Sequence, residues 1–343
     1  MTSLHNRVNK EILKQRLVDE PFNRTTLSFY RYVIIDQPQA FRDVVYAQLD
    51  ELNCFGRIYV AREGINAQMS VPTENLKVFL EILEKNEYLK NMPIKYAVED
   101  DGKSFYKLIV RLKNRILADG LDDNAYDVTN VGKHLTAMEF HELAVKEETL
   151  VIDMRNRYES EIGHFENAVC PEADTFREEI QMVTEEFKDQ KGRKILLYCT
   201  GGIRCEKASA YFKHLGFSDV NQLHGGVIEY AQQIKKEGLQ SRYIGKNFVF
   251  DNRMCESIDH RVVGKCHQCG APTDTHVNCA NDACHLLFIQ CAVCAEKYNH
   301  CCSVECQEFI QLPEETQRFL RKERVFNGTL NGYKGLRERL SAI

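Results

Sequence analysis

The chain has 343 residues, a formal net charge of −5 and 43% hydrophobic residues, which predicts a globular protein of more than one domain. A net negative charge excludes binding of nucleic acid through overall charge, so any contact with RNA needs a local basic patch. No apolar run follows Met1 and no window approaches a membrane span, so we expect a cytoplasmic protein with no membrane contact and mostly reduced cysteines.

The first predicted domain covers residues 26–120 and follows an N-terminal helical extension at residues 1–25. Its apolar pattern predicts strands at 27–35, 57–60, 65–71 and 106–112 and helices at 40–52 and 75–83. The order strand, helix, two strands, helix, strand favours a ferredoxin-like α+β domain. In the last strand and its continuation, four basic residues share the odd-numbered positions and so point to one face: Lys107, Arg111, Lys113 and Arg115. This basic strip either binds RNA or is ordinary solvated surface.

A polar, turn-rich stretch at 118–124 predicts a linker to a second domain at 125–245. Here helices near 136–145, 176–187 and 205–215 alternate with strands at 150–153 and 195–198. This alternation predicts an α/β domain whose parallel sheet is covered on both faces. Open α/β sheets place their chemistry at the carboxyl ends of the strands. Cys199 follows one such strand, and Asp153 and Arg155 end and follow another.

Residues 195–206 combine an apolar strand, a cysteine and a glycine-bearing loop that ends at Arg204 as a helix begins. Gly201 and Gly202 let successive backbone amides point inward, and the helix N-terminus and Arg204 favour an anion there. Cys199 is therefore the candidate nucleophile, although a buried structural cysteine is the alternative.

Two neighbouring features of this loop remain open. Cys205 could resolve an oxidised Cys199 by forming a disulfide, provided that the helix brings the two thiols together. Asp153 and Arg155 either support the site or form a structural ion pair.

Loop size separates two cysteine chemistries. Only four residues, 200–203 with Ile203 as the last, lie between Cys199 and Arg204, whereas a cysteine phosphatase needs a wider cradle for a phosphate. The shorter loop suits a persulfide sulfur, and here the chain resembles the rhodanese family. Residues 151–155, 161–165 and 223–227 resemble the opening strand, the Gly-His signature and the closing turn of that family.

The third region, 246–343, is a Cys-rich module with a basic helical tail and holds nine cysteines between Cys266 and Cys306. Their interleaved pairs predict a cross-braced arrangement of two metal sites, with zinc as the first choice. One site uses Cys266, Cys269, Cys291 and Cys294; the other uses Cys279, Cys284, Cys306 and either Cys301 or Cys302. The alternative is a loop-rich subdomain with free thiols. In the tail, Arg318, Arg321 and Lys322 form either a phosphate-binding strip or a solvated helix face.

Together with Arg62–Asn66 upstream and the cysteines downstream, the rhodanese motifs make the whole chain similar to the bacterial rhodanese-related tRNA uridine hydroxylases. The resemblance implies a central rhodanese domain between a ferredoxin-like domain and a small Cys-rich module. It also implies oxygen-dependent 5-hydroxylation of the wobble uridine, with Cys199 as the essential thiol and Arg204 stabilising its anion. Molecular oxygen is then a co-substrate, with an electron donor that the sequence does not name. The partner is the tRNA anticodon arm, and no DNA is expected.

Two other functions compete with hydroxylation. A rhodanese sulfurtransferase would pass sulfane sulfur through a Cys199 persulfide and needs only the loop. A non-enzymatic RNA-binding or zinc scaffold would not need an intact Cys199 and Arg204. The sequence has no G-x-G-x-x-G flavin or NAD fingerprint and no evident 2-His-1-carboxylate spacing.

Overall fold

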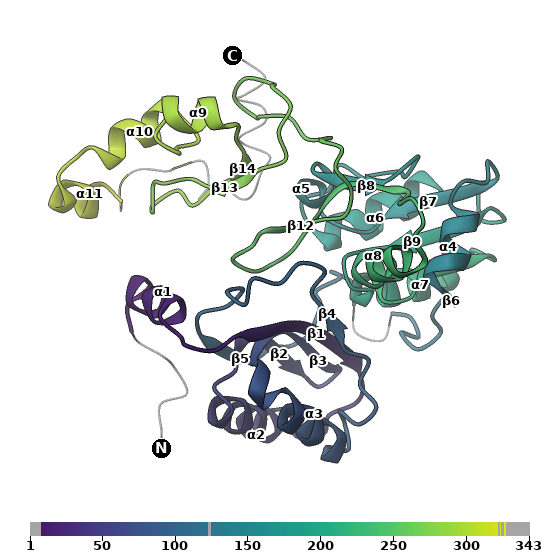
Figure 1. Ribbon diagram of the computed structural model, residues 1–343. Helices are drawn as coiled ribbons and strands as arrows, with labels where there is room; N and C mark the ends of the chain where they lie inside the picture. The colour runs from purple at the N-terminus through teal and green to yellow at the C-terminus, as the bar shows by residue number, and fades with distance from the viewer. Residues whose placement is uncertain (1–7, 123–124, 322, 324–325, 327–343) are drawn as a thin grey trace.

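The computed structural model describes residues 8–122, 125–321, 323 and 326, and its elements form three parts in chain order (Figure 1). After α1 (Lys10–Val18), the N-terminal part has a five-stranded sheet of order β4-β1-β3-β2-β5. The strands are β1 (Arg24–Tyr32), β2 (Phe55–Ala61), β3 (Gly64–Pro72), β4 (Lys95–Tyr96) and β5 (Leu108–Leu112), and the helices are α2 (Pro38–Glu51), α3 (Leu76–Lys85) and the short η1 (Thr73–Asn75).

The ferredoxin-like prediction is confirmed, but its fourth strand was assigned wrongly. The strand expected at 106–112 is β5, which lies parallel to β2 at one edge of the sheet. The strand that completes the βαββαβ order is β4, which pairs with β1 at the opposite edge. Because β4 has only two residues, it leaves no alternating pattern for sequence analysis to detect.

The two faces of the N-terminal sheet differ in composition. One face packs Phe29, Ile58 and Met69 against Phe41 of α2 and Phe79 of α3, all of them buried. Successive side chains of a strand point to opposite faces, so the other face carries the alternate residues, which are polar or aromatic. Helices α2 and α3 lie on the first face, and within the described residues 8–122 the second face is left to the central part, toward which it is turned (Figure 1).

The central part is the predicted parallel sheet, of order β6-β10-β9-β7. Its strands are β6 (Lys133–Leu135), β7 (Thr149–Asp153), β9 (Lys194–Tyr198) and β10 (Val220–Leu223). Helices α6 (Phe176–Glu186) and α7 (Ile203–His214) contribute to the core on one face, and α4 (Ala137–Leu143) and α8 (Gly226–Glu237) contribute to the core on the other. The cysteine loop therefore lies at the carboxyl end of a central strand.

A second, antiparallel sheet joins the central part to the C-terminal module. It has the order β12-β11-β8, from β8 (Gly163–Phe165), β11 (Tyr243–Phe248) and β12 (Cys255–Ser257), and the short helix α5 (Arg157–Ser160) precedes β8. The module contains β13 (His276–Asn278), β14 (Leu287–Ile289), α9 (Ala292–Lys297), α10 (Val304–Ile310) and α11 (Glu314–Leu320). Across all the residues placed here, no helix has the length and apolar character to cross a membrane.

Candidate active site

Cys199 directly follows β9, and α7 begins four residues later at Ile203. Gly202 caps this helix with φ +99°, a left-handed conformation that side chains rarely adopt. A Cβ at Gly202 would also lie 2.7 Å from the hydroxyl oxygen of Tyr30. The backbone N–H of Gly202 donates to Cys199 Sγ at 3.1 Å. Gly202 is thus required both for the turn and for the close approach of the N-terminal sheet.

The electrostatics of the loop favour the thiolate of Cys199. Burial by itself would raise the pKa of this thiol. A hydrogen bond from the Cys205 thiol, the charge of Arg204 and backbone N–H groups at the start of α7 outweigh burial and lower the pKa to about 5. The side chain therefore carries a negative charge at neutral pH, as a nucleophilic cysteine requires.

Arg204 is held by a carboxylate that the sequence analysis missed. Its guanidinium donates to both carboxylate oxygens of Glu159, at 2.5 Å and 2.8 Å, and to Thr200 Oγ1 at 3.3 Å. Glu159 is fully buried on α5 and also accepts from the backbone N–H of Asn156. A glutamate three residues after an N-cap asparagine is a capping-box signal that could have placed it. The pair fixes the guanidinium, and its two charges compensate each other.

Glu179 on α6 is a second buried carboxyl near the loop. Burial raises its pKa well above the ordinary value, and the opposing charge of Arg204 does not offset this effect. Its two carboxyl oxygens are buried and have no hydrogen-bond partner within the described part of the chain. Glu179 is therefore held in its neutral form and adds no negative charge beside Cys199.

Cys205 is fully buried at the start of α7, and its thiol hydrogen-bonds to Cys199. Burial and the negative charge of Cys199 raise the pKa of Cys205 well above its ordinary value. Cys205 is consequently a protonated donor to the sulfur of Cys199 in this structure.

Asp153 and Arg155 lie in a separate network. Their side chains are fully buried and form an ion pair at 2.6 Å. Arg155 also donates to Tyr243 Oη and to the carbonyl of Gly163, and Asp153 accepts from Tyr198 Oη. Neither residue lines the cavity beside Cys199. This geometry corresponds to the structural ion pair, one of the two interpretations of these residues.

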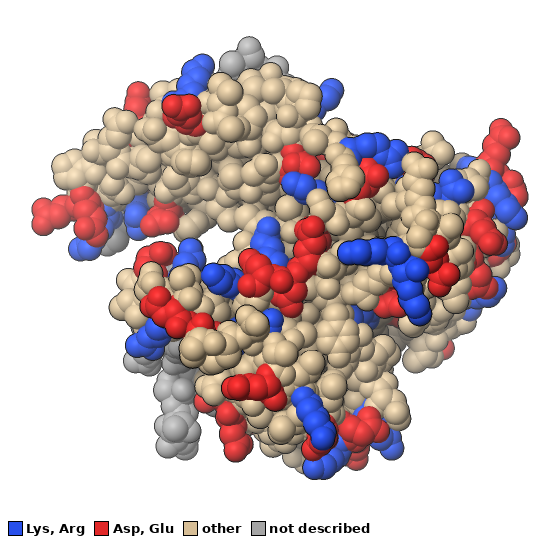
Figure 2. Space-filling model, viewed as in Figure 1, with Lys and Arg blue, Asp and Glu red and all other residues tan. Residues whose placement is uncertain are grey.

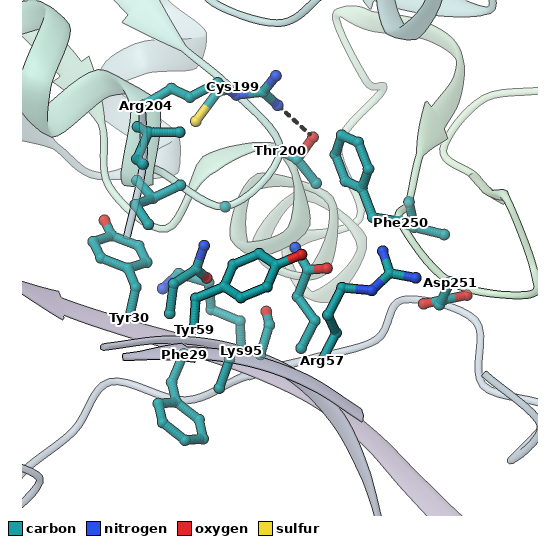
Figure 3. A pocket seen from close by; sticks show the side chains of 18 of the residues that line it. Phe29, Tyr30, Arg57, Tyr59, Lys95, Cys199, Thr200, Arg204, Phe250 and Asp251 are labelled. Atoms are coloured by element: carbon teal, nitrogen blue, oxygen red, sulfur yellow. Dashed lines mark hydrogen bonds between the residues drawn. The ribbon is translucent and has the colours of Figure 1, made fainter. Parts of the chain in front are cut away.

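A cavity of about 520 Å³ lies between the cysteine loop and the uncovered face of the N-terminal sheet (Figure 3). The cysteine sulfur lies on the side of the loop that faces the sheet (Figure 3). One wall consists of loop residues, the second of residues from the sheet, and a third of the segment around Phe250. The lining includes Cys199, Thr200, Gly201, Ile203, Arg204, Tyr30, Arg57, Tyr59, Asn66, Gln68, Lys95, Phe250 and Asp251.

The cations of this cavity fall into two groups. Arg204 is paired with Glu159, Arg253 with Asp251 and Glu256, and Arg115 with Asp119. For Arg57, Lys95 and Lys113, by contrast, no carboxylate partner occurs among the residues that the structure describes. These three cations come from the N-terminal part and line the cavity without a paired carboxylate.

The predicted basic strip on β5 is only partly brought to the site. Lys113 and Arg115 line the cavity, and the ammonium of Lys113 lies 5.4 Å from the ring centroid of Tyr59. Lys107 lines a smaller adjoining cavity of about 280 Å³. Arg111 is an exposed residue of β5 that lines neither cavity.

Helix α11, which carries the described part of the basic tail, lies away from β9 and α7 and the cysteine loop between them in Figure 1. Arg318 on α11 forms an exposed ion pair with Glu314, and Arg321 is exposed at the end of that helix. Lys322 lies outside the described residues. On the face shown in Figure 2, positive and negative side chains are intermixed, so no continuous basic patch covers that face.

Eight cysteines of the C-terminal module form two clusters that could each hold a metal ion: Cys266, Cys269, Cys291 and Cys294 in one, and Cys279, Cys284, Cys302 and Cys306 in the other. Within each cluster all sulfurs lie within 4.8 Å of one another. The clusters draw on alternate pairs along the chain, which is the predicted cross-brace, and the structure selects Cys302 rather than Cys301.

The sulfur spacing fits tetrahedral thiolate coordination. Tetrahedral bonds of about 2.3 Å place sulfurs about 3.8 Å apart. The Cys269–Cys291 and Cys284–Cys302 sulfurs are 3.6 Å and 3.7 Å apart, and the Cys302–Cys306 sulfurs are 3.8 Å apart. Four sulfur donors at this spacing suit zinc.

Sequence analysis did not predict that the N-terminal sheet forms a wall of the cysteine site. A signal was present in β3, where Asn66 and Gln68 alternate with the buried Ile65, Ala67 and Met69. That pattern identifies an uncovered polar face, but only the folded chain shows what the face is opposed to.

Comparison with known families agrees with this architecture and defines the class. The family described as "Rhodanese-like domain" matches residues 136–233, and the family described as "Rhodanase C-terminal" matches residues 244–307. "UPF0176 acylphosphatase like domain" matches residues 24–116. The central part is therefore a rhodanese-like domain between two further matched segments.

Curated relatives that match nearly the whole chain are named tRNA uridine(34) hydroxylase, and two of them serve as examples. The protein of Leptospira interrogans serogroup Icterohaemorrhagiae serovar Lai is 54% identical over 340 residues, covering 99% of this chain and 93% of the relative. That of Yersinia enterocolitica is 50% identical over 339 residues, covering 98% of this chain and 97% of the relative. The chain belongs to the tRNA uridine(34) hydroxylase family.

Solved structures resemble parts of the chain. A rhodanese-like domain protein from Staphylococcus aureus is 20% identical, with a TM-score of 0.24 over 29% of this chain and 90% of that protein. A protein from Anabaena sp. is 21% identical, with a TM-score of 0.26 over 32% of this chain and 91% of that protein.

Proposed function

We propose that this protein hydroxylates C5 of uridine 34 in tRNA, in an oxygen-dependent reaction that requires Cys199. Relatives at 50–54% identity are named for uridine 34 of tRNA. The observation that carries the proposal to this chain is a cysteine held as a thiolate, facing a cavity lined by cations that have no paired carboxylate in the described residues. Such an enzyme acts on the anticodon arm of tRNA in the cytoplasm.

The cavity has the chemical character of a nucleotide site. Arg57 and Lys113 can neutralise phosphate oxygens, which provide most of the affinity of proteins for nucleic acid. Tyr59 offers a ring on which a base can stack. For the side-chain amides of Asn66 and Gln68, no hydrogen-bond partner is present in the described ranges, so both can pair with the edge of a base.

Hydroxylation sets requirements beyond these residues. Replacing the C5 hydrogen by a hydroxyl group takes one oxygen atom from O₂. The other atom is reduced to water by two electrons and two protons, so the reaction needs a two-electron donor. In this proposal the described residues bind the nucleotide and hold the thiolate, and the two electrons come from a donor that the sequence does not name.

The experiment uses a bacterial host in which tRNA uridine 34 is not hydroxylated. The host expresses wild-type protein, Cys199→Ala or, as a control, Cys170→Ala, which removes a half-buried cysteine outside the cavity. Nucleosides from its tRNA are analysed by mass spectrometry after growth with and without oxygen. We expect one added oxygen atom on uridine with wild type and Cys170→Ala in air, and none with Cys199→Ala or without oxygen. Oxygen addition by Cys199→Ala would exclude the thiol from the reaction.

A sulfurtransferase is the second candidate, favoured by the low pKa of Cys199 and the narrow loop. It predicts that purified protein releases thiocyanate from thiosulfate and cyanide at a rate that depends on Cys199. Thiocyanate release combined with unmodified tRNA in the host would replace the hydroxylase proposal by this one.

We further propose that both thiolate clusters bind zinc and that the metal stabilises the C-terminal module. The module has few large apolar residues, so metal binding would supply much of its folding free energy.

A further inference from the structure

Lys95 is brought to the cysteine site by the two-residue edge strand β4. It pairs with Ser28 of β1, and the carbonyl of the next residue, Tyr96, accepts a 2.7 Å hydrogen bond from Gln232 of α8. This contact attaches β4 to the central domain. The Lys95 side chain leans over the cysteine loop, since its Cδ lies 3.8 Å from the position that a Cβ on Gly201 would occupy.

Lys95 is buried without a conventional partner. It is only 7% exposed, and in the described part of the molecule it has neither an ion pair nor a side-chain hydrogen bond. Its ammonium lies 4.5 Å from the ring centroid of Tyr30, a cation–π contact. An ammonium is costly to bury unless a nearby negative charge compensates it.

The charges around Lys95 identify the compensating group. Glu206 of α7 and Glu229 of α8 also attract Lys95. Both carboxylates, however, already accept hydrogen bonds from other side chains: Glu206 from His134, Gln222 and Tyr30, and Glu229 from Gln233. Burial lowers the pKa of Lys95, and the largest influence that opposes this shift is Cys199. Figure 3 shows Lys95 and Cys199 on opposing walls of one cavity.

Charge balance at Cys199 leads to the same pairing. The charge of Arg204 is already compensated by the two oxygens of Glu159. Arg204 still favours the thiolate, together with Cys205 and the backbone N–H groups of α7. Lys95 adds a second cation, unpaired in the described residues, that interacts with Cys199.

We propose that Lys95 is a positioning residue that holds Cys199 as a thiolate, so that the N-terminal domain completes the active site of the rhodanese-like domain. The inference rests on the proposed role of Cys199 as the essential thiol. It adds that the central domain alone lacks one of the two cations of the site.

The test measures the pH dependence of Cys199 alkylation by iodoacetamide in the full-length protein. The Cys199 peptide is quantified by mass spectrometry, which separates it from the other 13 of the 14 cysteines. Wild type is compared with Lys95→Met, Lys95→Arg and the matched control Lys113→Met, which removes another unpaired cation of the same wall. Because Cys199 is fully buried, access limits the plateau rate, whereas the midpoint of the profile reports the thiol pKa.

We expect Lys95→Met to move the midpoint upward by roughly one pKa unit, the order of magnitude for removing a unit charge that lines the same buried cavity. At pH 5, with each rate expressed as a fraction of its own plateau, this shift makes alkylation of Lys95→Met about fivefold slower than that of wild type. Lys95→Arg keeps the charge and should keep a midpoint close to that of wild type, and Lys113→Met should leave it unchanged. A Lys95→Met midpoint equal to that of wild type, in protein with native circular dichroism, would overturn the proposal, as would an equal shift with Lys113→Met.

The readout contains no tRNA, so the two proposals can fail separately. If the midpoint shifts but wild type does not hydroxylate tRNA, Lys95 retains its role and the proposed reaction is wrong. If tRNA is hydroxylated and the midpoint does not move, the reaction stands and Lys95 has no part in holding the thiolate.

Discussion

At the scale of single residues, the site depends on how a few charges and one small residue are placed. The anion of Cys199 is favoured by the start of α7, and the cation of Arg204 is fixed by Glu159. Gly202 leaves room for the Tyr30 hydroxyl. Substitutions of Gly202 and of Cys199 should therefore have measurable effects.

Gly202→Ala should inactivate the protein and destabilise it by about 1–3 kcal/mol, because alanine is strained at φ +99° and its Cβ meets the Tyr30 hydroxyl. Adding Tyr30→Phe should recover part of the stability, since the nearest remaining ring carbon is 3.7 Å from that Cβ. Thermal unfolding measures the loss of stability and its recovery, and the tRNA assay measures the loss of activity. Gly192→Ala is the control, because nothing lies within 4 Å of a Cβ built at that position. Equal losses of stability at positions 192 and 202 would contradict the prediction.

The ionisation of Cys199 should couple stability to pH. Its folded pKa of about 5 lies below the ordinary value of 9.0, so the thiolate stabilises the fold above the unfolded pKa, and this stability is lost as pH falls toward 5. Serine does not ionise in this range. The advantage of wild type over Cys199→Ser should therefore grow by up to about 1.4 kcal/mol per pH unit between pH 5 and 9. Urea unfolding at several pH values measures the difference in unfolding free energy between the two proteins. A difference that does not change with pH would show that the Cys199 thiol is neutral.

At the scale of elements, short segments have effects out of proportion to their length. The two residues of β4 place Lys95, and the four residues of α5 place Glu159. In the C-terminal module, short strands and helices are arranged around two clusters of sulfur atoms. Such elements have little independent stability, so their positions depend on what they contact.

The two adjacent cysteines of the module should behave differently. Cys302→Ser should lower the zinc content from two ions to one per chain and reduce the thermal stability of the module, because Cys302 belongs to a four-sulfur cluster. Cys301→Ser should keep both ions, since Cys301 is buried beside the cluster but is not one of its four members. Elemental analysis of the purified variants measures the number of zinc ions per chain. Equal zinc loss in both variants would show that the cluster is assigned wrongly.

At the scale of the whole molecule, the N-terminal and central domains are joined by buried charge. Lys207 of α7 forms ion pairs at 3.0 Å with Glu63 and with Asp119, and it donates to the carbonyl of Leu117 at 2.9 Å. Its side chain is 2% exposed. These contacts hold the uncovered sheet face over the cysteine loop, so the cavity is a product of domain docking.

Lys207→Met should separate the unfolding of the two domains. Removing one partner of a buried ion pair costs about 3–5 kcal/mol, because the remaining carboxylates are left without compensation. We expect differential scanning calorimetry to show an earlier transition for the N-terminal domain and faster proteolysis near residue 118. Lys188→Met, which removes an exposed pair with Glu185, is the control. A single unshifted transition in Lys207→Met would contradict docking through this residue.

The amino-acid sequence determined the local features of this protein. The parallel sheet, the glycine turn after Cys199 and the cysteine pairs of the module follow from periodicity, conformational preference and spacing, which act over short stretches of chain. Only the tertiary structure decided that Glu159 pairs with Arg204, that Cys302 rather than Cys301 joins the cluster, and that β4 brings Lys95 to the thiolate. These contacts join segments distant in sequence or choose between adjacent residues, and both depend on how the packed domains orient side chains.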